Sequence, residues 1–337
     1  MHPDNRLVFG INTLRGISAI WVLLTHFGPP LTVGIEKTSY LNIAIRGVVH
    51  NAFNGPAAVI VFFVISGFCI HFPQSSSLKI TSIPQFYLKR LVRIMIPLAV
   101  AMVISSNSGL GGLDFADSIV WSLICEIIYY LLYPLVLIIR KLLGSWLIIF
   151  GVTFSAALYL SLSNPQAMNY PSFGWELNWV LGLPCWIIGC IVAESVDCKK
   201  AICKINITYI RLFVWIVSLL LSIIRFHPVV GISIGYPLSL NFFAILVGCW
   251  ILNEISWSEK YGVNSFLEWI GKWSYSIYLV HVIACPLFYI IFPIASNHGM
   301  VSWSLMIGFC FVVCYLFYLV VEKPSHWLAR SLAKRIQ

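Results

Sequence analysis

The sequence predicts an all-α protein that crosses a membrane about ten times. Three observations support this fold class: the composition, the length of the apolar stretches and the placement of the basic residues between them. Of the 337 residues, 60% are hydrophobic and 10% are charged, whereas about 25% of an ordinary soluble domain is charged. We expect a single membrane-embedded domain over residues 1–337.

Ten apolar stretches are candidate membrane spans, although several are shorter than the roughly 20 residues that cross a bilayer comfortably. The fourth, sixth, ninth and tenth are the clearest. The ten stretches are 9–28, 55–72, 91–107, 118–139, 146–163, 177–194, 211–226, 236–253, 273–293 and 301–321.

Basic residues predict the orientation of these spans. If the N-terminus is cytoplasmic and the spans alternate, the outer segments contain only Lys37, Arg46 and Arg225. Arg15 lies within the first span, and all other lysines and arginines fall on the inner side. Cytoplasmic loops carry an excess of Lys and Arg. We therefore expect both termini in the cytoplasm, and membrane topology explains the net charge of +9 better than nucleic-acid binding does.

The first span contains two ionisable side chains, Arg15 and His26, which are eleven residues apart. At about 3.6 residues per turn, this spacing places both on one helix face, about 16 Å apart along the axis. Ionisable groups within a bilayer are costly and usually face the bundle interior or a hydrated cavity. We therefore expect Arg15 and His26 to face such a cavity.

The second span and the segment after it offer two further patterns. Ser66 and Gly67 permit close helix packing, and a packing role and a functional role are both open for them. Arg90 and Arg93 are three residues apart and share a helix face. Two guanidinium groups on one face suit a phosphate or pyrophosphate, although the positive-inside rule alone also places basic residues here.

The fourth span contains Glu126 among apolar residues. A carboxylate in this position must be protonated, paired or hydrated. Arg15 and His26 are the best partners elsewhere in the chain, and a purely structural Arg–Glu pair is the alternative.

The ninth span carries Ser274, Tyr278 and His281, whose spacings of four and three residues put them on one helix face. They are candidate cavity residues, although a hydrogen-bonded structural histidine is an equal alternative. The last span ends at Glu322-Lys323-Pro324, where the proline is expected to stop the helix.

Together these segments resemble the acyltransferase-3 family of integral membrane acyltransferases. Each motif alone is weak, but six occur in family order over nearly the whole chain. They are Leu14-Arg15-Gly16 with His26, Phe62-Phe63-Val64-Ile65-Ser66-Gly67-Phe68, Arg90-x2-Arg93-Ile94 with Pro97, Trp121-Ser122-Leu123-x2-Glu126 with Tyr130 and Pro134, Ser274-x3-Tyr278-Leu279-x-His281, and Glu322-Lys323-Pro324.

The resemblance implies a ten-helix bundle in the cell membrane that moves an acyl group, usually acetyl from acetyl-CoA, onto a carbohydrate at the outer side. The acceptor would be O-antigen of lipopolysaccharide, an exopolysaccharide or a lipid-linked precursor. His26 would be the catalytic base with Arg15 as its essential neighbour, and Arg90 and Arg93 would bind acyl-CoA. No metal is expected. Two departures from the family are Ile124, where a polar residue is common, and the lack of the additional periplasmic domain that some members carry.

The residues also suggest a mechanism and a competing function. His26 has a side chain of suitable pKa, about 6.5 in reference peptides, to take the proton of a sugar hydroxyl. Glu126 is expected to orient the His26 ring in a relay of the triad type, with direct acyl transfer rather than an acyl-enzyme. The alternative is a transporter or polysaccharide exporter, because intramembrane Arg, His and Glu also mark proton-coupled carriers.

Overall fold

The computed structural model describes residues 9–32, 39–110, 113, 119–197, 205–226, 234–293 and 299–336, and no strand occurs among them. The predicted all-α fold class is confirmed. The α-helices are α1 (Ile11–His26), α2 (Tyr40–Asn51), α3 (Gly55–His71), α4 (Ile83–Ser108), α5 (Val120–Leu143), α6 (Trp146–Ser163), α7 (Gly174–Asp197), α8 (Ile207–Phe226), α9 (Tyr236–Tyr261), α10 (Ser265–Gly271), α11 (Ser274–Ile291), α12 (Met300–Phe317) and α13 (Lys323–Lys334). A π-helical turn, η5 (Tyr318–Glu322), joins α12 to α13.

Eight helical segments in the described part of the chain are long and apolar enough to cross a membrane, so the protein is a polytopic membrane protein. Each of the ten predicted spans coincides with a helix, but α1 and α4 are not among these eight. With 16 residues, α1 is short for a full crossing. The helix over 91–107 begins earlier than expected, at Ile83, and its first turns carry several basic and polar residues.

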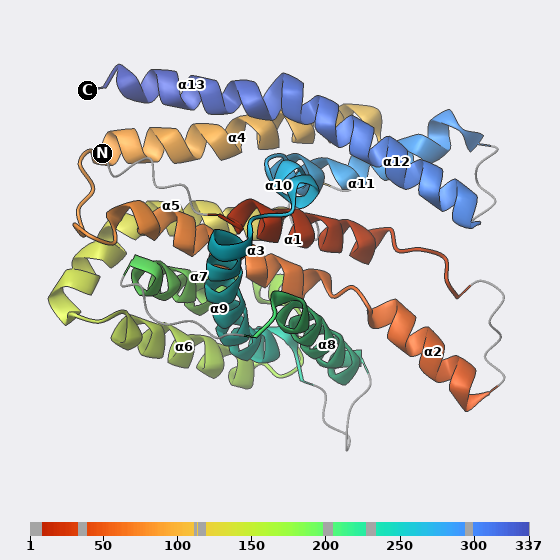
Figure 1. Ribbon diagram of the computed structural model, residues 1–337, viewed down its shortest axis with the longest axis horizontal. Helices are drawn as coiled ribbons and strands as arrows, with labels where there is room; N and C mark the ends of the chain where they lie inside the picture. Colours follow the sequence, from red (N-terminus) through yellow and green to blue (C-terminus); the bar gives the residue numbers. More distant parts are fainter. Residues whose placement is uncertain are drawn as a thin grey trace.

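The segment between the first two predicted spans, expected on the outer side, is partly helical, which the search for apolar stretches missed. Its helix α2 exposes apolar side chains, among them Leu41 and Ile43, and it packs beside α8. Figure 1 shows α2 projecting away from the rest of the bundle. An amphipathic helix with this placement is typical of segments that lie near a membrane interface.

The centre of the bundle depends on a close crossing of α3 and α7. A Cβ added at Gly189 would lie 2.6 Å from the backbone nitrogen of Phe68 and also against the carbonyl oxygen of Val64. A Cβ at Gly67 would meet the carbonyl oxygen of Trp186 and lie 3.3 Å from the Cα of Gly189. Small residues at a helix crossing let the backbones approach. The packing interpretation of Gly67 is therefore confirmed.

A second close approach positions α1 on the short helix α10. A Cβ at Gly16 would lie 2.6 Å from the carbonyl oxygen of Leu267. The carboxylate of Glu268 accepts hydrogen bonds from Asn12 Nδ2 (3.1 Å), from the Thr13 backbone N–H (2.9 Å) and from Thr13 Oγ1 (2.9 Å). Because the first N–H groups of a helix have no intrahelical partner, Glu268 supplies a cap from a distant part of the chain and fixes the start of α1.

The connections show which ends of the helices lie together. Figure 1 shows the α3–α4 connection, the α5–α6 turn and the C-terminal end of α13 at one end of the bundle, on the left. We call this the inner end and the opposite one the outer end, because the charge distribution predicts these segments to be cytoplasmic. Helix α13 runs along α4 (Figure 1), and Gln85 Nε2 donates to the carbonyl oxygen of Ala333 at 2.9 Å.

Candidate active site

A cavity of about 920 Å³, including space open to solvent, lies among α1, α3, α4, α5 and α11. Gly271, the last residue of α10, Lys272, which follows it, and Glu322, at the end of η5, complete its wall. Seven helical elements from across the sequence therefore contribute to one site.

Four cationic side chains line this cavity: Arg15, Arg90, Arg93 and Lys272. Arg15 Nη2 is 3.6 Å from the sulfur of Cys69. Within the described residues, Arg90 and Arg93 form no hydrogen bond or ion pair with another side chain. Guanidinium groups with unused donors in a cavity are suited to bind phosphate oxygens. The expected shared face of Arg90 and Arg93 is thus present and points to the cavity.

Two carboxylates face these cations. Glu126 Oε1 accepts a hydrogen bond from Ser66 Oγ at 2.9 Å and a shorter one from the hydroxyl of Tyr130. Ser66 is therefore a cavity residue as well as part of the helix crossing. Among the described residues no hydrogen bond joins Glu126 to His26: Glu126 Oε1 accepts from Ser66 and Tyr130, and His26 Nδ1 pairs with His281.

Glu322 is the second carboxylate, and the sequence analysis missed it as a site residue. Glu322 is 1% exposed, and its Oε2 accepts from the backbone N–H and the hydroxyl of Ser276. The interpretation of Glu322-Lys323-Pro324 as a plain helix stop is wrong, since helix continues through α13. Glu322 ends a π-helical turn, and such turns are often found at functional sites. No pattern in the sequence predicted this turn.

The three residues expected on one face of α11 lie in two places: two line the cavity, and the third belongs to a pair of histidines. Ser274 and Tyr278 line the cavity as expected. The Tyr278 hydroxyl lies 2.6 Å from Ser122 Oγ and donates to the carbonyl oxygen of Ile119 at 3.1 Å. His281, one turn further along α11, does not line the cavity.

His281 instead contacts His26. His26 Nδ1 lies 2.8 Å from His281 Nε2, and His281 Nδ1 lies 2.9 Å from the carbonyl oxygen of Ile277. A carbonyl oxygen only accepts, so His281 Nδ1 carries the hydrogen and the neutral ring accepts at Nε2. His26 Nδ1 must then donate to His281, which leaves His26 Nε2 as the free basic nitrogen. This assignment follows from the hydrogen bonds, as tautomers generally must.

The two parts of the site occupy different depths. Arg15 and Glu126 share the cavity, but His26 does not line it, so of the two residues of α1 that were expected to face a cavity only Arg15 lines this one. His26 lies at the C-terminal end of α1, about 16 Å beyond Arg15 along the helix. His281 is completely buried, whereas His26 is exposed at the outer end. The site therefore has a cationic inner cavity and an outer histidine pair.

A family model described as an acyltransferase domain, the acyltransferase-3 model, matches residues 8–319. The chain belongs to the acyltransferase-3 family, and it is a membrane acyltransferase. No curated protein and no solved structure gives a match.

Proposed function

We propose that this protein transfers an acyl group from acyl-CoA, with acetyl-CoA as the expected donor, to a hydroxyl of a cell-surface carbohydrate or its lipid-linked precursor. The reaction takes place in the cell membrane. One observation carries the proposal: the cavity is cationic toward the inner end and apolar toward the outer end. Acyl-CoA has the same polarity, with several phosphate groups at one end and an acyl thioester at the other.

In the proposed binding mode, Arg90 and Arg93 bind the phosphates, because their guanidinium donors face the cavity without side-chain partners in the described part of the chain. Lys272 is exposed at the end of α10 and adds charge there. Glu126 and Glu322 offset part of this positive charge. The pantetheine arm would extend past Arg15 toward Tyr278.

The proposed chemistry takes place between Tyr278 and His26. His26 Nε2 accepts the proton of the acceptor hydroxyl while the hydroxyl oxygen attacks the thioester carbonyl carbon. The new C–O bond forms, the C–S bond breaks, and His26 returns the proton to the departing CoA thiolate. Arg15 lies about 16 Å from His26 along α1, so in this scheme it helps to hold the donor within the cavity and does not contact the reacting carbonyl. His281 holds the His26 ring through the Nδ1 hydrogen bond.

Purified protein supplied with radiolabelled acetyl-CoA and carbohydrate acceptor tests this proposal. We expect label in the carbohydrate and release of free CoA, and His26→Gln should lower turnover about 10²–10⁴-fold, since glutamine cannot act as the base. His50→Gln, which changes an exposed histidine on α2, is the matched control and should leave turnover unchanged. Near-normal transfer by His26→Gln would exclude the base role. Carbohydrate flux without CoA release would favour an exporter.

A further inference from the structure

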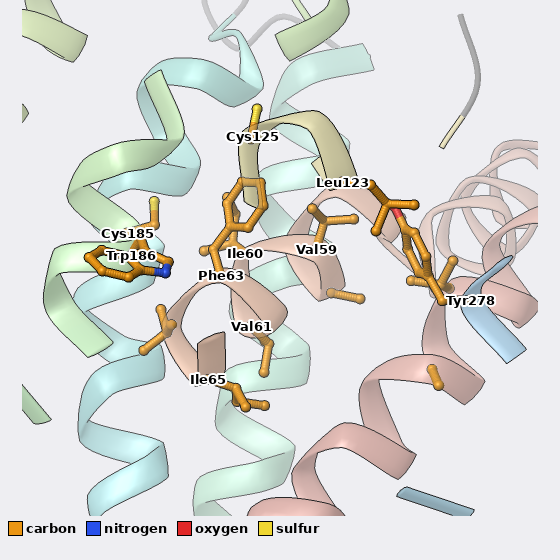
Figure 2. Close-up of a cluster of buried hydrophobic side chains, with 14 of the residues drawn as sticks. Val59, Ile60, Val61, Phe63, Ile65, Leu123, Cys125, Cys185, Trp186 and Tyr278 are labelled. Carbon is orange, nitrogen blue, oxygen red and sulfur yellow. The ribbon is translucent and has the colours of Figure 1, made fainter. Parts of the chain in front are cut away.

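The outer end of the cavity is built from apolar and aromatic side chains. They are Val59, Phe62 and Phe63 of α3, Leu123 of α5 and Tyr278 of α11. Figure 2 shows Val59, Phe63, Leu123 and Tyr278 in the same buried cluster. The rings of Phe62 and Tyr278 meet edge to face, with centroids 5.8 Å apart. This end has the character of a pocket for a small apolar group.

Most of this wall is fixed in place. The Tyr278 hydroxyl is held by Ser122 and by the Ile119 carbonyl oxygen. Phe63 packs edge to face against Trp121 and Tyr129, at centroid distances of 6.0 and 5.5 Å. Movement of these rings would break buried hydrogen bonds or aromatic contacts, so the space at this end is set by the side chains that line it.

Phe62 differs from the other members of the wall. It is partly exposed, whereas Val59, Phe63, Leu123 and Tyr278 are buried. Its only described ring contact is the one with Tyr278. Phe62 lines the cavity beside Tyr278, so its ring limits the space there.

Tyr278, with Phe62 against it, is the last residue of α11 that lines the cavity. His281, three residues or about 4.5 Å further along the axis, does not line it and contacts His26. An acyl group at the outer end of the cavity therefore abuts these two rings, one helical turn from the level of the histidines.

We infer that Phe62 and Tyr278 form a constriction that closes the outer end of the cavity and thereby determines the length of the acyl group that the cavity accepts. The inference rests on the proposed acyl-CoA reaction. The constriction admits an acetyl group, excludes longer chains and limits the access of water from the exposed His26 side to the thioester. In pockets of this kind, one additional methylene changes the specificity about 10–200-fold.

The test compares acetyl-CoA, butyryl-CoA and hexanoyl-CoA as donors for purified wild-type protein, Phe62→Leu and Phe62→Ala. The measured quantity is kcat/KM for each longer donor relative to acetyl-CoA. We expect this ratio to rise from wild type to Phe62→Leu to Phe62→Ala, by about tenfold or more for butyryl-CoA in Phe62→Ala. Hydrolysis of acetyl-CoA without acceptor should rise in the same order.

Two variants separate the constriction from general damage. Phe68→Ala truncates a buried phenylalanine of the same helix that stacks on Phe72 outside the cavity, and it should leave the donor ratio unchanged. Tyr278→Phe removes the hydroxyl but keeps the ring, so it should also keep the preference for acetyl. Phe62→Leu preserves an apolar side chain and covers the possibility that Phe62→Ala does not fold.

The outcomes distinguish the inference from the function on which it rests. Wild-type transfer of acetyl with an unchanged donor ratio in both Phe62 variants would overturn the constriction and leave the acyltransferase proposal intact. A rise in the ratio in Phe68→Ala equal to that in Phe62→Ala would also overturn it. Failure of the wild-type protein to release CoA from all three donors would contradict the proposed function itself.

Discussion

At the scale of single residues, His281 determines which nitrogen of His26 is available. Because His281 Nδ1 donates to the Ile277 carbonyl oxygen, His281 Nε2 is an acceptor, and His26 Nδ1 donates a hydrogen bond to it. In the proposed mechanism, His281 would have the part that the buried aspartate plays in a Ser-His-Asp triad, which is to hold the imidazole in one tautomer and one orientation. An uncharged partner gives less stabilisation to the imidazolium than a carboxylate does.

A pair of substitutions at this position tests the orientation of His26. His281→Ala should lower turnover about 10²-fold or more, and His281→Gln should recover part of the loss, because its amide oxygen can accept from His26 Nδ1. The KM for acyl-CoA should stay constant in both, since His281 does not line the cavity. The pH–rate profile of His281→Ala should also shift. Equal loss in both variants, with an unchanged pH profile, would indicate a packing role.

The arginine pair gives a second prediction at this scale. Charge-assisted hydrogen bonds contribute about 1.5–3 kcal/mol each, so Arg90→Ala or Arg93→Ala should raise the KM for acyl-CoA roughly tenfold or more. Arg90→Lys should recover only part of the affinity, because an ammonium group cannot make the planar paired contact. Arg330→Ala, which changes an exposed arginine of α13, is the control. Wild-type KM values in both alanine variants would reduce Arg90 and Arg93 to topology signals.

Helical spacing predicts which residues share a helix face. It does not predict which residues of other helices they contact, or at what depth in the bundle they lie. It is correct for Arg90 and Arg93, because both lie on one helix. It fails for His26, whose partner is 255 residues away in the sequence, and for Glu126, which is satisfied by Ser66 and by Tyr130 one turn along its own helix. The spacing of Tyr130 from Glu126 can be read from the sequence. That Glu126 bonds to Tyr130 and not to Arg15 or His26 depends on how α1, α3 and α5 pack.

At the scale of elements, the crossing of α3 and α7 places the cavity wall. Gly67 faces α7 and Ser66 faces Glu126. Of these two neighbouring residues of α3, one therefore packs against another helix and the other belongs to the candidate active site. The Ser66-Gly67 pair was detectable in the sequence because small residues at helix crossings are common. Helix α10 was not predicted, since seven residues are too few to give a periodic signal, although it caps α1.

Gly67→Ala is the corresponding stability test. The new Cβ would meet the Trp186 carbonyl oxygen, and backbone shifts of this kind cost about 1–3 kcal/mol. Thermal unfolding in detergent should therefore begin at a lower temperature. Gly151→Ala is the control, because a Cβ there would contact no other residue and alanine favours helix over glycine. A lowered midpoint for Gly151→Ala, or an unchanged one for Gly67→Ala, would contradict the crossing.

At the scale of the whole molecule, the alternating helices place the inner cavity and the outer histidine pair at opposite ends of α1. Composition and apolar length are sufficient to predict an all-α membrane protein, because a bilayer admits few other structures. The exact number of crossings depends on two helices that line the cavity. Helix α1 has only 16 residues, and α4 carries basic and polar residues in its first turns. The side of the membrane that each end faces stays a prediction from the basic residues.

Cysteine labelling tests that orientation. Ser76 lies exposed in the α3–α4 connection, and Ser76→Cys should react with a membrane-impermeant maleimide only after the membrane is opened. Tyr40→Cys at the start of α2, where the native side chain is 95% exposed, should react in intact cells. Labelling is measured over that of the unsubstituted chain, because Cys249 is exposed. Strong labelling of Ser76→Cys in intact cells would contradict the predicted topology.

The packing of α1 against α10 and α11 has a consequence for the order of biosynthesis. Glu268 and His281 follow their α1 partners Thr13 and His26 by 255 residues in the chain. Until they are synthesised, the start of α1 lacks its cap and His26 lacks its ring partner, although α1 can already pack against α3. A product that ends before His281 therefore lacks the hydrogen bond that holds the His26 ring.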